Sequence, residues 1–154
     1  MPGRPPLILR ATVTLTAVAV IATGCSANGT VTVTPPDVTG AAALACSHLV
    51  NYLPARLDGH HTRVVSPSSP LVHAWGSPPI VMRCGVPRPA GFSRSSPQTA
   101  TVDGVIWFQE IGQHTVTWTA IRKSAYVALT VPTSYQAQGG LLVELGAALE
   151  RGLP

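Results

Sequence analysis

The spacing of apolar residues predicts one amphipathic helix near each end of the chain. The first apolar stripe consists of Ala42, Cys46, Leu49, Val50 and Leu53. The second consists of Leu141, Leu142, Leu145, Ala148 and Leu149, with Glu144, Glu150 and Arg151 on the opposite face. Residues at such intervals lie on one side of an α-helix and can pack against a core. We expect Asp37 or Thr39 to cap the first helix and Pro54 to end it, and Gly152 to end the second.

Between these helices, apolar and polar residues alternate, which is typical of half-buried β-strands. The alternating stretches are 80–86, 99–102, 105–111, 114–121 and 125–131, with a short edge strand at 62–65. Asp103-Gly104 and Gly112-Gln113 are expected to form the turns of two hairpins. The sequence therefore predicts an α+β fold: a mostly antiparallel sheet of four or five strands, with an N-terminal and a C-terminal helix packed on one face.

Several finer expectations follow from the same pattern. In 114–121, Val116, Trp118 and Ala120 should be buried while Thr115, Thr117 and Thr119 face water. The proline-rich stretch 87–97 should be a loop without core residues. His60 and His61 should lie in a solvated turn.

The first 25 residues resemble a bacterial export signal that ends in a lipidation site. Arg4 and Arg10 precede the apolar stretch 11–22, which is too short to span about 30 Å of hydrocarbon comfortably. Ala22-Thr-Gly-Cys25 follows and is similar to a lipobox, whose cysteine is lipidated and becomes the new N-terminus. We predict a signal peptide over 1–24, a flexible tether over 25–38 and one extracytoplasmic domain over 39–154. A retained single-pass anchor is the alternative.

Lipidation would make the membrane the first partner of the protein. Acyl chains such as palmitate on Cys25 contribute about 0.8 kcal/mol per buried methylene, and two chains suffice for stable anchoring. The domain is then expected on the outer face of the cytoplasmic membrane, because the positive end of the signal stays inside. In the tether, Val31–Thr34 alternates like a strand, but Pro35-Pro36 follows and no pairing partner is evident.

Lipidation of Cys25 also changes the cysteine count. It leaves Cys46 and Cys84, both on predicted buried faces, as the two thiols available in an oxidising compartment. We expect them to form a disulfide. A zinc site that includes His48 and a catalytic thiol remain as alternatives, although Cys46-Ser-His48 lacks the spacing of a zinc motif.

The most distinctive run is Ala74-Trp-Gly-Ser-Pro-Pro-Ile-Val-Met-Arg-Cys-Gly-Val-Pro87. Trp75 is expected in a loop before the strand, where it either closes the core or stacks against a ligand. Arg83 should lie on the outer face, solvated or paired with an acid such as Glu110. Together with the flanking helices and the Val-x-Trp strand, this run resembles an actinobacterial family of exported proteins, domain of unknown function thirty-five fifteen, over about 40–153. The resemblance implies a cell-envelope protein with a cysteine pair and no known activity.

Charge and motifs exclude several functions. Without the signal, eight basic and six acidic residues give a net charge of +2, and the basic residues are scattered, so a nucleic-acid surface is not expected. Gly91-Phe-Ser93-Arg-Ser95 lacks the last glycine of a nucleophile elbow, and no phosphate-binding loop or carboxylate pair is present.

We therefore expect no catalytic residues, no metal and no cofactor. The expected function is a binding module that uses a surface around Trp75 and Arg83, with other envelope proteins as further partners. A hydrolase-like envelope enzyme and a purely structural anchored protein are the alternatives.

Overall fold

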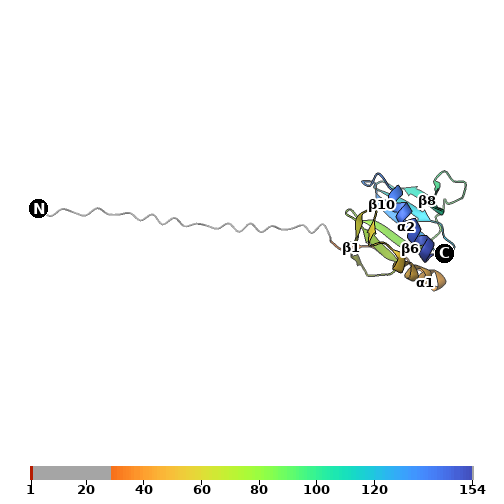
Figure 1. The fold of residues 1–154 in the computed structure, drawn as a ribbon, viewed down its shortest axis with the longest axis horizontal. Coiled ribbons are helices and arrows are strands. Elements are labelled where there is room, and N and C mark those ends of the chain that lie inside the picture. The colour runs from red at the N-terminus through yellow and green to blue at the C-terminus, as the bar shows by residue number, and fades with distance from the viewer. Residues whose placement is uncertain (2–28, 154) are drawn as a thin grey trace.

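The computed structural model describes Met1 and residues 29–153 (Figure 1). The predicted signal peptide and Cys25 therefore lie outside the described residues. Within them, eight strands form one antiparallel sheet in the spatial order β2, β3, β5, β6, β10, β9, β8, β7. These strands are β2 (Arg56–Leu57), β3 (His60–Arg63), β5 (Val72–Trp75), β6 (Ile80–Val86), β7 (Thr99–Val102), β8 (Val105–Ile111), β9 (Thr115–Ala120) and β10 (Tyr126–Pro132).

The α+β class and the antiparallel sheet are confirmed, but the predicted number of strands is wrong. The five strands from β6 to β10 match the predicted stretches closely, because their alternation of apolar and polar residues is regular. β3 overlaps the edge strand predicted at 62–65, whereas β2 and β5 are additional. β2 has only two residues and β5 is largely buried on both faces, so neither shows a regular alternation of apolar and polar positions. His60 and His61 lie in β3 rather than in a turn.

A second, two-stranded sheet pairs β1 (Val31–Thr32) with β4 (Val65–Ser66) in parallel. The amide of Val31 donates to the carbonyl of Val64 at 2.8 Å, and the Val31 side chain is buried. The expectation that this segment lacks a partner is thus wrong. The described part of the predicted tether is therefore paired to the domain at Val31–Thr32. Its partner β4 begins at the last residue of the edge strand predicted at 62–65 and ends directly before Pro67.

The two predicted helices are present as α1 (Gly40–Leu49) and α2 (Gly139–Gly152). A short 3-10 turn (Val50–Tyr52) extends α1, and the chain becomes extended at Leu53, directly before Pro54. Thr39 holds the N-cap position of α1, but its side chain makes no capping hydrogen bond. Leu49 of α1 and Leu141, Leu145 and Leu149 of α2 join the same core as Met82 and Leu129 of the sheet, so both helices pack on one face. We call this the inner face.

The helix α2 crosses the inner face diagonally. Its first turn lies at the β2 corner, where a Cβ on Gly140 would come within 2.7 Å of the Asp58 carboxylate. Its last turn lies at the β7 corner, where Glu150 approaches the Asp103-Gly104 turn. A 14-residue helix is about 21 Å long, whereas eight strands are about 33 Å wide. One diagonal helix therefore leaves two corners of the inner face uncovered.

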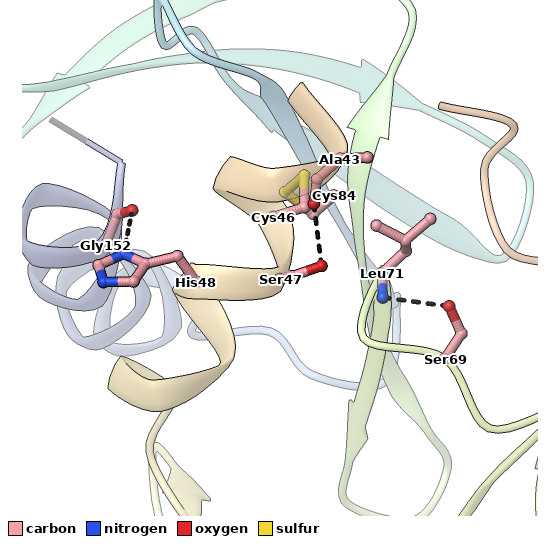
Figure 2. Close-up of a disulfide and its surroundings, with 8 residues drawn as sticks. All are labelled: Ala43, Cys46, Ser47, His48, Ser69, Leu71, Cys84 and Gly152. Carbon is pink, nitrogen blue, oxygen red and sulfur yellow. Dashed lines mark hydrogen bonds between the residues drawn. A yellow bond between two sulfur atoms is a disulfide. The ribbon is translucent and has the colours of Figure 1, made fainter. Parts of the chain in front are cut away.

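Part of the inner face beside α2 is covered by α1, which is joined to β6 by the predicted disulfide between Cys46 and Cys84 (Figure 2). Both cysteines are fully buried, and their Cα atoms are 5.6 Å apart. A zinc site or a catalytic thiol at these two cysteines is excluded, because their sulfur atoms are bonded to each other. His48 instead turns towards α2, with Nδ1 3.4 Å from the carbonyl oxygen of Gly152.

The outer face of the sheet is partly covered by the loop 87–98, contrary to the expectation that this loop contains no core residue. Phe92 is 9% exposed and packs edge-to-face on Phe108 of β8, with ring centroids 5.9 Å apart. Arg88 lies over the Phe92 ring and donates a hydrogen bond to its carbonyl. Thr119, the neighbour of Phe108 across β8 and β9, is consequently buried rather than wet.

We predict that the disulfide contributes a large share of the stability. It closes a loop of 38 residues, which in the chain-entropy model corresponds to about 4 kcal/mol. Urea unfolding of the wild type with and without reductant should show this loss as a shift to a lower midpoint. The double variant Cys46→Ala, Cys84→Ala should unfold at that lower midpoint whether or not reductant is present. Equal midpoints for oxidised and reduced wild type would contradict the prediction.

Candidate functional site

The corner of the inner face that neither helix covers lies on β8 and β9. Exposure along two rows of paired residues locates it. In one row, Leu129 of β10 is fully buried, whereas its partner Trp118 and the next residue, Gln109, are half-buried. In the row nearer the sheet end, Val131 is fully buried, Val116 is half-buried and Ile111 is 76% exposed. In these two rows, the helices therefore cover β10 but not β9 or β8.

A groove of about 440 Å³ occupies this uncovered corner, between the sheet and the start of α2. We call it the Trp118 groove. Its apolar walls are Val102, Val116, Trp118 and Leu142. Its polar lining consists of the side chains of Gln109, Gln136 and Gln138, with Gly139 at the first turn of α2. Its volume and its mixture of an apolar wall with a few polar groups are typical of small-molecule sites.

Hydrogen bonds fix the Trp118 ring at the groove. The indole Nε1 donates to Oε1 of Gln138 at 2.6 Å, and Nε2 of Gln138 donates to the carbonyl of Tyr135 at 3.0 Å. The Tyr135 hydroxyl then donates to the carbonyl of Pro78 at 2.8 Å. Both ends of the Gln138 carboxamide are thus engaged, so the indole is held in one orientation before any ligand arrives.

This chain of bonds gives the distinctive run 74–87 a structural role. Pro78 belongs to the turn between β5 and β6, and the Tyr135 ring also packs edge-to-face against His60, with centroids 4.9 Å apart. The Tyr135 hydroxyl lies so close to Gly76 that a Cβ there would come within 2.7 Å of it, and Gly76 has a φ of +73°. The turn at Gly76 therefore supports the 133–138 segment, which in turn positions Trp118.

The structure corrects the predicted binding surface around Trp75 and Arg83. Trp75 is the last residue of β5, not part of a loop; it is fully buried, and its indole donates to the carbonyl of Pro54 at 3.0 Å. Arg83 is half-buried on the outer face, whereas Trp75 pairs with Ile80 and lies on the inner face. The two residues cannot form one surface. Glu110 is also out of reach of Arg83, because three strand spacings, roughly 14 Å, separate β6 from β8.

Other polar groups in the described part of the chain do not assemble into a reactive site. No three His, Cys, Asp or Glu side chains among these residues lie close enough together to hold a metal ion. Burial lowers the pKa of His73 below its ordinary value, and a backbone hydrogen bond at Val72 partly opposes this shift. Burial thus disfavours the charged form of His73, and its buried Nδ1 has no hydrogen-bond partner within the described residues. Neither described helix has the length and apolar content needed to cross a bilayer.

Sequence reasoning missed the Trp118 groove because it assigned Val116 and Trp118 to a buried face without asking how far the helices reach. One signal was present. The inner-face residues of β8 are Val105, Trp107, Gln109 and Ile111, so a carboxamide interrupts an apolar set that is otherwise suited to full burial. A polar side chain on the inner face of a strand indicates that no helix covers the sheet at that residue.

Fold and groove together define a disulfide-linked α+β domain with one open corner on its helical face. The chain matches the family described as Protein of unknown function (DUF3515) over residues 7–154 and therefore belongs to that family. The match extends the resemblance found over 40–153 to almost the whole chain. Neither curated proteins nor solved structures gave a match.

Proposed function

We propose that this protein is a lipid-anchored binding protein of the cell envelope that holds a ligand in the Trp118 groove and catalyses no reaction on it. The observation that carries the proposal is the pre-oriented indole in an open groove lined by carboxamides. Sites of this kind lose little conformational entropy on binding, because the contacting side chain is already ordered.

The extracytoplasmic location is supported by two independent features. The buried disulfide is typical of proteins that fold in oxidising compartments. The N-terminal sequence has the charge pattern of an export signal, followed by the lipobox-like Ala22-Thr-Gly-Cys25. An anchor at Cys25 would be close to the domain, since the four residues to Gly29 span at most about 14 Å.

The same anchor would orient the groove towards the membrane. The Arg63 guanidinium donates to the carbonyls of both Gly29 and Gly76, so the described chain begins beside the turn between β5 and β6. Because the sheet is antiparallel, this turn lies at the same sheet end as Ile111 and the 133–138 segment. A ligand in the Trp118 groove would thus lie near the membrane surface.

Binding without catalysis is favoured by the chemistry of the lining. Carboxamides donate and accept hydrogen bonds but do not titrate near neutral pH, so Gln109, Gln136 and Gln138 are unsuited to general acid or base catalysis. Within the described part of the chain, no serine, cysteine or histidine that could act as a nucleophile lines the groove. What the arrangement offers is shape, an aromatic surface and fixed hydrogen-bonding groups.

We expect photo-cross-linking in intact cells to distinguish the groove from the remaining surface. A photoreactive amino acid at Ile111, on the groove rim, should capture a defined adduct, and Trp118→Ala should abolish this capture. The matched control is the same amino acid at Leu44 of α1, which is 74% exposed against 76% for Ile111. Equal adducts at both positions, or an Ile111 adduct unaffected by Trp118→Ala, would contradict binding in the groove.

Lipidation is tested separately by intact mass. Protein extracted from its native membrane should begin at Cys25 and carry additional acyl mass, and Cys25→Ala should release the domain from the membrane fraction. A chain that begins at Met1 without modification would show that the anchor is wrong. Because the cross-linking result does not depend on this mass, the two parts of the proposal can fail independently.

A further inference from the structure

We infer that the ligand of the Trp118 groove is an uncharged carbohydrate segment. This inference rests on the proposed binding function and specifies the class of ligand for the same site. Three properties of the described lining support it: its lack of charge, the half-exposed indole and the carboxamides that have no protein partner.

Among the residues that the structure describes, no charged side chain lines the groove. The start of α2 would by itself favour an anion, since the first amides of a helix carry partial positive charge. Here two carboxylates already lie at that end: Asp58 is next to Gly140, and Oε2 of Glu144 accepts a hydrogen bond from the Asp58 amide at 2.7 Å. These negative charges repel an anionic ligand, so a phosphate or carboxylate ligand is disfavoured.

The indole of Trp118 offers a flat apolar surface rather than a deep apolar pocket. It is half-buried, and the hydrogen bond from Nε1 to Gln138 favours its present orientation. A sugar ring carries one face of C–H groups that can lie against such an aromatic surface. A purely aliphatic ligand would leave the surrounding carboxamides without hydrogen bonds, which costs free energy for every desolvated polar group.

The carboxamides match the hydroxyl groups of a sugar. Gln138 is bonded to Trp118 through its carbonyl and to Tyr135 through its amide group, but the side chains of Gln109 and Gln136 make no hydrogen bond to other described residues. Each carboxamide presents a donor and an acceptor side by side, and adjacent sugar hydroxyls can accept from the one and donate to the other. The two free carboxamides therefore provide specific contacts, while Trp118 provides the apolar contact.

Intrinsic fluorescence can report on this site specifically. The other two tryptophans, Trp75 and Trp107, are fully buried, so acrylamide should quench mainly Trp118. We would titrate the oxidised domain with maltotriose, cellotriose, mannotriose and chitotriose, and with trigalacturonate as an anionic counterpart. At least one neutral trisaccharide should protect Trp118 from quenching in a saturable manner, and trigalacturonate should not.

Variants assign the effect to the groove. For the trisaccharide that responds, Gln109→Ala should weaken the affinity about tenfold, which is equivalent to one lost hydrogen bond of about 1.4 kcal/mol. Asn51→Ala removes an exposed carboxamide in the 3-10 turn after α1, which does not line the groove, and it should leave the affinity unchanged. Equal weakening by both variants would show that the response does not come from the groove and would overturn the inference.

The inference is also overturned if none of the four neutral trisaccharides protects Trp118. A blocked tetra-alanine peptide serves as the second class of neutral probe. If the peptide protects Trp118 and the sugars do not, the ligand class is wrong while binding in the groove stands. If no probe protects Trp118 and Ile111 also gives no specific cross-link, the proposed function fails together with the inference.

Discussion

The diagonal packing of α2 across the inner face determines where the other parts of the domain can lie. Leu141, Leu145 and Leu149 are buried against the sheet, and the helix reaches from the β2 corner to the β7 corner. At about 25 cal/mol per Å² of buried apolar surface, a stripe of fully buried leucines is among the largest stabilising terms in a small domain. Shifting α2 to cover the open corner would expose the core under its present position.

The disulfide fixes the position of the other helix, α1. With Cys46 bonded to Cys84, α1 is held over β6 and cannot move to the open corner at β8 and β9. The run 74–87 contributes on both sides: Cys84 anchors α1, and Pro78 accepts the hydrogen bond of Tyr135 that leads to Gln138 and Trp118. The most distinctive part of the sequence thus builds the scaffold, and the candidate site lies at the end of a hydrogen-bonded chain that starts there.

The residues that were predicted correctly have a local signal. Ile80–Val86 and Val105–Ile111 alternate regularly, Asp103-Gly104 both adopt the positive φ that a tight hairpin turn requires, and Cys46 and Cys84 lie on inward faces. The residues that were predicted incorrectly depend on non-local packing. Trp75 is buried because its side chain joins the core on the inner face and reaches the Pro54 carbonyl, and Trp118 is half-exposed because α2 passes to one side of it. The alternation of residues within a strand does not indicate how far a helix that is distant in sequence extends over that strand.

Hydroxyl-radical footprinting in native membranes tests most directly whether the open corner is a binding site. The method compares the labelling of exposed side chains in purified protein and in intact cell envelopes. We expect Trp118 and Ile111 to be labelled in the purified domain and protected in the envelope, while Leu44 of α1 is labelled equally in both. Equal labelling of Trp118 in the purified protein and in the envelope would contradict a ligand in the groove.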